Sequence, residues 1–243
     1  MRQIPCETCP LRGLQVFRDF TAEELKFISG FKAGELSVEP GTTFLNQGAS
    51  NAHVFTVLSG WGFRYKDMDD GRRQILNYVF PGELVGLQGA VLREMEHSVQ
   101  ALSAMVLCVF ERQRLWELYE KHPALGFDIT WLAAREERIL EDHLLSVGRR
   151  TAEERMAYLL IHLFDRAQRV GMTQGDSLDM PMTQQHVSDT LGLSLVHTNK
   201  TLRRLFDKKL VSWKKRTLKI LDADNLRNLA RYESRQDECR PLI

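Results

Sequence analysis

The sequence has no long hydrophobic run and no excess of either charge. Its 243 residues include 33 Lys and Arg against 32 Asp and Glu, which gives a formal net charge of +1. This balance excludes a uniformly basic nucleic-acid-coating protein and a polyanionic disordered chain, although a total can conceal a local basic face. No apolar stretch approaches the roughly 20 residues needed to span a bilayer, and the N-terminus lacks the apolar core of a secretion signal. We therefore expect a cytoplasmic protein without a membrane partner.

Cysteine is scarce, with Cys6, Cys9, Cys108 and Cys239 as the complete set. Four cysteines in a chain of this length do not make a disulfide scaffold, and a protein without a secretion signal remains in a reducing compartment. The Cys6-x-x-Cys9 spacing therefore predicts thiol or metal chemistry rather than a structural cross-link.

The N-terminal half is rich in short β-prone runs. Thr21 and Glu24 form a capping box that predicts a short helix. From about residue 36 to 110, the runs 53–58, 62–65, 74–80 and 106–110 are separated by turn residues. Asp70-Gly71 between two of these runs is typical of a β-hairpin, because a type I′ turn needs positive φ. Short strands at this spacing predict a sandwich or small barrel.

A long helical pattern begins at Pro123. One stripe on the predicted helix follows a spacing of four and three residues and comprises Leu125, Ile129, Leu132, Glu136, Ile139 and His143. A second stripe beside it comprises Leu140, Leu144 and Val147. The second stripe packs either on a second copy of the helix or within its own domain, and the spacing alone leaves both open. We expect Gly148-Arg149-Arg150 to break this helix. We also expect a new helix capped by Thr151 and Glu154, and a frayed polar tail after Glu233.

Residues 183–221 have the pattern of a winged helix-turn-helix. Thr183 is the predicted N-cap of a short helix, Gly192 the turn, and Ser194 the N-cap of a second helix extending to about residue 206. Two strand-like runs around Lys214-Lys215-Arg216 predict a wing with a basic tip. The segment contains nine Lys or Arg against two Asp. A compact basic patch on this motif is typical of binding to the phosphate backbone.

The exposed face of the second helix is the predicted base-reading surface. Leu195 and Val196 can touch thymine methyl groups, Asn199 can pair with adenine, and Lys200 can donate to guanine. His197 contacts either a base edge, a phosphate or only solvent. The remaining cations are expected to hold phosphates and set the register: Arg203, Arg204, Lys214, Lys215 and Arg216.

Over nearly its whole length the chain resembles the CRP/FNR family of bacterial transcription regulators. The matching features follow the family's order: a β-rich domain containing Phe80-Pro81-Gly82-Glu83-Leu84-Val85-Gly86-Leu87, a long helix, and a helix-turn-helix containing Gly192-Leu193-Ser194. The resemblance implies an α+β protein with an N-terminal cyclic-nucleotide-binding-like β jelly roll, a long dimerisation helix and a C-terminal winged helix-turn-helix. It also implies a homodimer on pseudo-palindromic double-stranded DNA and contact with RNA polymerase.

The resemblance predicts four segments. These are an N-terminal arm (1–20), a β-roll sensor domain (21–122), a dimerisation helix (123–148) and a DNA-binding domain (149–243).

Two departures from the family concern its effectors. Relatives that bind cyclic nucleotides hold the cyclic phosphate with an Arg-Ser or Arg-Thr pair, where this chain has His97-Ser98. A mostly neutral imidazole does not replace a guanidinium on a phosphate, so cyclic AMP is not expected. An effector pocket of another kind would include Gly82, Glu83, Leu84, His97 and Ser98.

The oxygen-sensing branch of the family holds an iron–sulfur cluster with an N-terminal cysteine cluster and one β-domain cysteine. Cys6, Cys9 and Cys108 match part of that set, but the further N-terminal cysteine is missing and Cys239 lies in the distant tail. A [4Fe–4S] cluster normally takes four thiolates. Three readings stay open: a cluster with one other ligand, a thiol–disulfide pair, or inert cysteines. That branch also carries Glu, Ser and Arg where this chain has Val196, Asn199 and Lys200, so the target sequence should differ.

An enzyme carrying a DNA-binding tail is the alternative from another functional class. The sequence contains no nucleophile–base spacing, phosphate loop or zinc motif that would support one. We therefore expect a non-enzymatic regulator, either redox- or oxygen-responsive through its cysteines or controlled by a different ligand or none.

Overall fold

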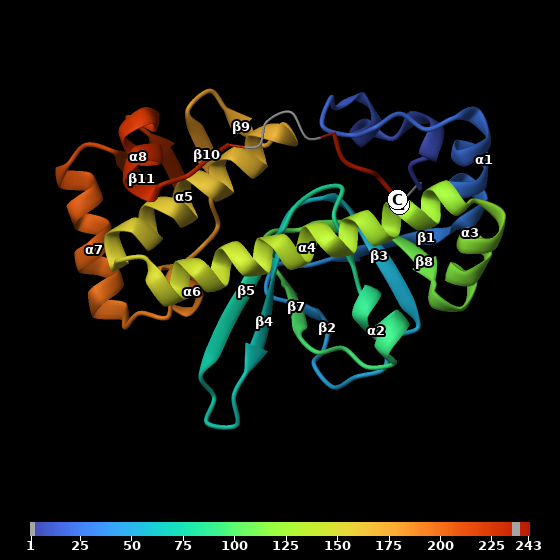
Figure 1. The fold of residues 1–243 in the computed structure, drawn as a ribbon, viewed down its shortest axis with the longest axis horizontal. Helices are drawn as coiled ribbons and strands as arrows, with labels where there is room; N and C mark the ends of the chain where they lie inside the picture. Colours follow the sequence, from blue (N-terminus) through green and yellow to red (C-terminus); the bar gives the residue numbers. More distant parts are fainter. Residues whose placement is uncertain (1–2, 235–238) are drawn as a thin grey trace. The chain divides into compact units, whose positions relative to one another are not determined.

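The computed structural model describes residues 3–234 and 239–243. It divides into two compact units, which we describe separately. The described residues of the first unit are 3–66, 78–138 and 239–243, and those of the second are 67–77 and 139–234. Figure 1 traces the elements along the chain.

The first unit begins with the short turns η1 (Cys6–Thr8) and η2 (Pro10–Gly13) and helix α1 (Ala22–Phe31). Thr21 caps α1 through the predicted capping box: its hydroxyl accepts the Glu24 backbone N–H at 3.1 Å, and the Glu24 carboxylate accepts the Thr21 N–H at 2.8 Å. Reciprocal caps of this kind satisfy two helix N-terminal donors at once.

Two four-stranded sheets make up the β-roll. The first has the order β1-β8-β3-β6, with β1 (Lys32–Val38), β8 (Met105–Glu111), β3 (His53–Ser59) and β6 (Leu84–Val85). The second has the order β2-β7-β4-β5, with β2 (Thr43–Leu45), β7 (Ser98–Ala101), β4 (Gly62–Asp67) and β5 (Arg73–Val79). The described pairings are antiparallel, as expected for a jelly roll. Gly71 has φ +82°, which agrees with the predicted hairpin turn.

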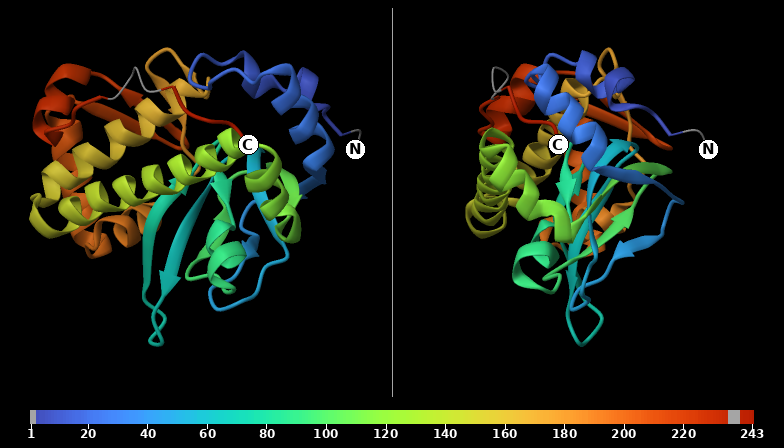
Figure 2. Two further views of the ribbon diagram at one scale, coloured as in Figure 1. Left: turned by 45° about the vertical axis from the view of Figure 1, so that its right-hand side comes forward. Right: turned by 90° about the vertical axis from the view of Figure 1, so that its right-hand side faces the viewer.

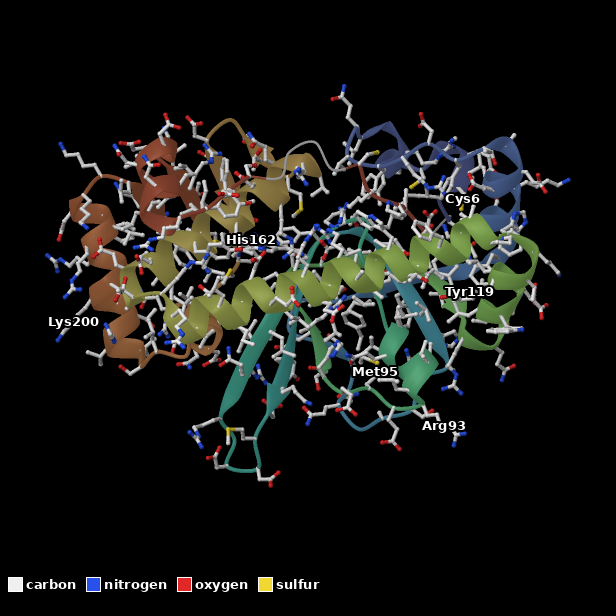
Figure 3. All side chains as sticks on the ribbon, in the orientation of Figure 1. Cys6, Arg93, Met95, Tyr119, His162 and Lys200 are labelled. Atoms are coloured by element: carbon white, nitrogen blue, oxygen red, sulfur yellow. The ribbon has the colours of Figure 1, made fainter. Side chains whose placement is uncertain are left out.

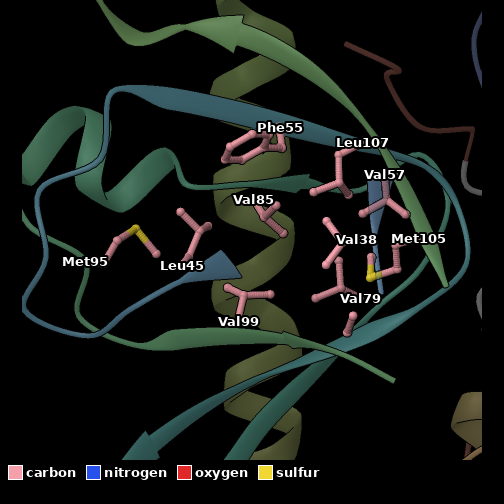
Figure 4. Packing of buried hydrophobic residues seen from close by; sticks show 11 residues of the cluster. Val38, Leu45, Phe55, Val57, Val79, Val85, Met95, Val99, Met105 and Leu107 are labelled. Atoms are coloured by element: carbon pink, nitrogen blue, oxygen red, sulfur yellow. The ribbon is translucent and has the colours of Figure 1, made fainter. Parts of the chain in front are cut away.

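The interior of the β-roll is apolar (Figure 4). The side chains of Val57, Val79, Val99 and Leu107 have no exposed surface. A second cluster, on the outer face of the first sheet, joins α1 and the first half of α4 to the strands. Burying each such side chain contributes about 1.5–3 kcal/mol. Helix α2 (Leu87–Leu92) lies between β6 and β7, whereas η3 (Arg112–Arg114) and α3 (Leu115–Lys121) connect β8 to the long helix.

The long helix α4 spans Pro123–Arg149 without interruption. The helix ends after Arg149, within the predicted break at Gly148-Arg149-Arg150. Leu125, Ile129 and Leu132 of the first predicted stripe are buried against the β-roll. The second stripe is open, with Leu140 38% and Leu144 73% exposed.

The second unit contains the predicted helix-turn-helix and wing. Its helices are α5 (Ala152–Arg169), α6 (Gln184–Leu191), α7 (Leu195–Asp207) and α8 (Ala223–Ala230). The sheet is larger than the predicted two-stranded wing, because β11 (Val211–Lys214) and β12 (Thr217–Ile220) continue into β10 (Ser177–Asp179) and β9 (Thr173–Gln174). The β9–β10 hairpin turns at Gly175, which has φ +56°.

Two further findings concern membrane contact and the chain end. No helix in the described part of the chain has the length and apolar character needed to cross a membrane. The prediction of a frayed tail after Glu233 was wrong for Arg240–Ile243, which are all buried in the first unit. These residues are buried because Arg240 pairs with the Glu83 carboxylate and the three residues after it are apolar. Residues 235–238 of that tail lie outside the described residues.

Candidate nucleic-acid interface

The turn between α6 and α7 is fixed by short-range hydrogen bonds. The Ser188 hydroxyl donates to the Leu193 carbonyl oxygen at 2.6 Å, and Gly192 adopts a left-handed conformation with φ +63°. Only glycine enters that region without steric cost, so the α6–α7 angle depends on this residue. Ser194 then caps α7 by accepting the His197 backbone N–H at 3.2 Å.

Thr183 at the start of α6 belongs to a capping box that the sequence pattern did not reveal. Its hydroxyl accepts the His186 N–H at 3.2 Å, and the Nδ1 atom of His186 accepts the Thr183 N–H at 3.1 Å. An Nδ1 acceptor requires the neutral ring. The pKa of His186 is lowered, chiefly by burial, which agrees with that requirement.

Helix α7 has one buried and one exposed face. Thr198, Thr201, Leu202 and Leu205 are at most 4% exposed. All the predicted reading and phosphate-holding positions of the helix are exposed: Leu195, Val196, His197, Asn199, Lys200, Arg203 and Arg204. The Lys200 side chain projects from the helix into solvent (Figure 3). The intervals from Val196 to Asn199, Lys200 and Arg203 are those of a single helix face.

The wing tip carries Lys214, Lys215 and Arg216, all exposed. Lys215 has φ +54°, so the tip turns sharply at a charged residue. Arg216 forms an ion pair with Asp179 of β10, Nη2 to Oδ2 at 2.9 Å. Sequence reasoning missed Asp179, because a carboxylate 37 positions earlier gives no local signal for this contact.

The candidate effector residues lie in the first unit, and Glu83 is already occupied. Its carboxylate is 2% exposed and contacts the guanidinium groups of Arg135 at 3.4 Å and Arg240 at 3.2 Å. Leu84 belongs to the apolar cluster beside α4. The Ser98 hydroxyl accepts the Gln47 N–H at 3.0 Å.

His97 is 6% exposed, and burial together with the nearby charges of Arg64 and Lys66 lowers its pKa to about 3. The ring is therefore neutral at physiological pH. It cannot act as a cation for a cyclic phosphate.

All three candidate cysteines lie in the first unit: Cys6 and Cys9 at η1, and Cys108 in β8, where it pairs with Glu35 of β1. Burial raises the pKa of Cys6 and raises that of Cys108 to about 12, and charges on the neighbouring thiols act in the same direction. The Lys32 ammonium opposes both shifts. Cys6 and Cys9 are half-buried, and Cys239 is exposed.

A metal site does not follow from this placement. Within the described ranges, no group of three or more His, Cys, Asp or Glu side chains is arranged to hold a metal ion. Three thiols are also fewer than the four that a [4Fe–4S] cluster normally takes. The side chains as placed therefore do not fit the cluster that the sequence resemblance implied.

Comparison with known proteins gives the family. The cyclic nucleotide-binding domain family matches residues 35–122, and the Crp-like helix-turn-helix domain family matches residues 154–229. The transcriptional activator FnrL of Cereibacter sphaeroides is 30% identical over 78% of this chain and 77% of its own length. The chain belongs to the CRP/FNR family.

Other CRP/FNR relatives agree in fold and role. The transcriptional activatory protein AadR of Rhodopseudomonas palustris is 27% identical over 93% of both chains. The solved structure of FixK2 from Bradyrhizobium japonicum has a TM-score of 0.74, with 24% identity over 82% of this chain and 98% of that one, which supports the fold. The predicted fold and family are thus confirmed. The chain is a DNA-binding transcription regulator and not an enzyme.

Proposed function

We propose that this regulator is a homodimer that reads specific DNA sequences with the exposed face of α7. The observation that carries the proposal is the division of α7 into a buried face and an exposed face that holds every predicted contact position of the helix. A recognition helix of this kind enters the major groove, where each base pair presents a distinct pattern.

Individual roles follow from side-chain chemistry. We assign thymine-methyl contacts to Leu195 and Val196, an adenine pair to Asn199 and a guanine contact to Lys200. His197 lies at the edge of this surface and contacts a base or a phosphate. We assign the phosphate contacts and the register to the remaining polar and cationic positions: Thr183, Ser194, Arg203, Arg204, Lys214, Lys215 and Arg216.

Helix α4 is the proposed dimer contact. It exposes Phe127 (68%), Leu140 (38%) and Leu144 (73%) to solvent while its other apolar stripe is buried. Two copies of such a stripe can cover each other in a helical pair. The resulting two-fold axis would place two α7 helices on half-sites about one helical turn apart. By its family, such a regulator acts on RNA polymerase, and we place it in the cytoplasm together with the chromosome.

For the sensory role we propose redox or oxygen responsiveness through Cys6, Cys9 and Cys108. Cys6 and Cys108, which are far apart in the sequence, pack against the same apolar cluster of the first unit, and this placement supports the proposal. The alternative is a regulator without an iron–sulfur cluster, either effector-independent or bound to a small ligand near Gly82, Glu83, Leu84, His97 and Ser98.

The DNA-reading assignment is tested with Asn199→Ala and Lys200→Ala. Each is expected to cost about 1–3 kcal/mol of discrimination between base pairs while leaving the oligomeric state unchanged. Lys121→Ala, an exposed lysine of α3, is the matched control and should bind DNA like the parent chain. If sequence-specific binding survives both α7 changes in fluorescence anisotropy, the assignment of the reading helix is wrong.

The cysteine proposal is tested by purification without oxygen followed by a visible spectrum, iron and sulfide assays, and DNA-binding titrations before and after oxidation. DNA affinity that changes on oxidation and loses that change in Cys108→Ser supports control through these thiols. A colourless, iron-free protein with the same DNA affinity in both states would rule it out.

A further inference from the structure

The last four residues of the chain are buried, although they follow an exposed cysteine. Cys239 is exposed, whereas Arg240, Leu242 and Ile243 are 4–5% exposed and Pro241 is also buried. Chain ends usually fray unless something holds them. We name residues 240–243 the C-terminal tail. It lies beyond residue 229, where the second family match ends.

Arg240 is the polar anchor of the tail. Its Nη1 atom lies 3.2 Å from Glu83 Oε1, and its Nη2 atom donates to the Pro81 carbonyl oxygen at 2.9 Å. The guanidinium also lies over the Phe17 ring, 4.6 Å from the centroid. A buried arginine is tolerated only with such partners, so these contacts define a specific arginine site.

The tail also binds the N-terminal arm through backbone groups. The Arg240 N–H donates to the Val16 carbonyl oxygen at 2.8 Å, and the Arg18 N–H donates to the Arg240 carbonyl oxygen at 2.9 Å. These bonds form a parallel bridge between Phe17 and Arg240. The Phe17 ring in turn rests on Gly82, where an added Cβ would lie 2.1 Å from a ring carbon. The arm is therefore held between the Gly82 turn and the tail.

The apolar end of the tail is anchored separately. Ile243 belongs to the cluster that includes Val54, Leu84, Ile129 and Leu132. The Thr56 hydroxyl donates to a terminal oxygen of Ile243. Figures 1 and 2 show this end of the chain beside the first half of α4, which belongs to the same unit. The site thus recognises an arginine and, three positions later, an apolar side chain with its backbone oxygen.

The site is suited to a ligand that can leave. Glu83 keeps Arg135 of α4 at 3.4 Å when Arg240 departs, so no buried carboxylate is left without a cation. Cys239, directly before the tail, is exposed, so the chain passes from solvent into the site at this residue.

We propose that the C-terminal tail is an internal peptide ligand of the first unit and clamps the N-terminal arm over the Gly82 turn. The first unit then contains a site for a peptide segment of sequence Arg-Pro-Leu-Ile. Arm and tail bind and leave together, because each supplies hydrogen-bond partners to the other. The proposal stands whether or not α7 reads DNA.

The test uses a shortened chain, which ends at Cys239 and lacks only the C-terminal tail. The probe is a fluorescein-labelled synthetic peptide, Gly-Ser-Arg-Pro-Leu-Ile. The peptide should bind the shortened chain saturably in an anisotropy titration. It should bind the complete chain much more weakly, because the tail already occupies the site. A peptide with Glu in place of Arg should bind the shortened chain about tenfold or more weakly, which corresponds to about 1.4 kcal/mol or more.

Hydrogen exchange measures the clamp on the arm. The Arg18 amide should exchange about tenfold faster in the shortened chain, as expected for the loss of one hydrogen bond, and the peptide should restore its protection. Full-length Arg240→Ala is a second variant that keeps the rest of the tail and should also speed this exchange. Arg72→Ala, which removes an exposed arginine paired with Asp70, is the matched control and should not.

Three results would overturn the proposal. The first is absence of saturable peptide binding by a shortened chain that remains folded by circular dichroism. The second is equal binding of the Arg and Glu peptides. The third is unchanged Arg18 exchange in Arg240→Ala, which also decides the matter if the shortened chain does not fold.

Discussion

The wing provides the most quantitative prediction about DNA binding. Lys214 and Lys215 are exposed at the tip of the β11–β12 hairpin, and we assign both to phosphates. Replacing both with Gln removes two charges per protomer and leaves an uncharged polar side chain that is one atom shorter. Gln is also no worse suited than Lys to the left-handed backbone of Lys215 at φ +54°.

The expected magnitude follows from counterion release. Each phosphate contact contributes about 0.9 to the slope of log affinity against log salt, so a dimer that loses about four contacts should show a slope lower by about 3.6. Between 50 mM and 200 mM salt the parent chain should then lose roughly a hundredfold more affinity than the variant. Anisotropy titrations on specific and unrelated duplexes across this range measure the slope. A change of less than about one, on either duplex, refutes phosphate contact by the wing.

Three further predictions concern the sensor unit and the dimer. His97→Asn should flatten the pH dependence of unfolding. A neutral buried imidazole with pKa about 3 makes the parent lose about 1.6 kcal/mol of stability between pH 6.5 and pH 5, since only the unfolded chain takes up the proton. An equal loss of stability over this pH range in urea unfolding of both proteins would disprove this. Gly82→Ala should lower the melting temperature more than Gly41→Ala, because both sites have positive φ but only Gly82 contacts Phe17. The backbone strain at positive φ alone costs about 1–3 kcal/mol at either site. Equal shifts of the two melting temperatures in calorimetry would argue against the contact. Leu144→Glu should give a folded monomer in sedimentation experiments. Val91→Glu, at a similarly exposed position on α2, should remain a dimer. A dimeric Leu144→Glu variant would contradict the α4 interface.

Local sequence signals predicted most of the architecture. The Thr21 and Thr151 capping boxes, the Gly71 hairpin and the Gly192 turn appear in the structure where their residue types predicted them. Each of these features depends on residues within a few positions of one another. The buried and exposed faces of α7 follow equally well from helical periodicity.

The remainder depended on contacts between distant residues. Asp179 of β10 pairs with Arg216 at the wing tip, and Arg240 pairs with Glu83, which precedes it by 157 positions in the sequence. The β9–β10 hairpin is too short to show a strand period, since its strands have only two and three residues. The tail was misjudged because composition describes what a free end does, whereas burial depends on a receiving site formed by other segments.

Selection of bound duplexes from a pool with a randomised central region tests the central claim most directly. A homodimer that reads DNA with α7 should enrich inverted repeats whose half-site centres lie about 10 base pairs apart. The Asn199→Ala variant should relax the preference at one position of each half-site. Recovery of an unbiased pool, or of a single unrepeated element, would contradict the account.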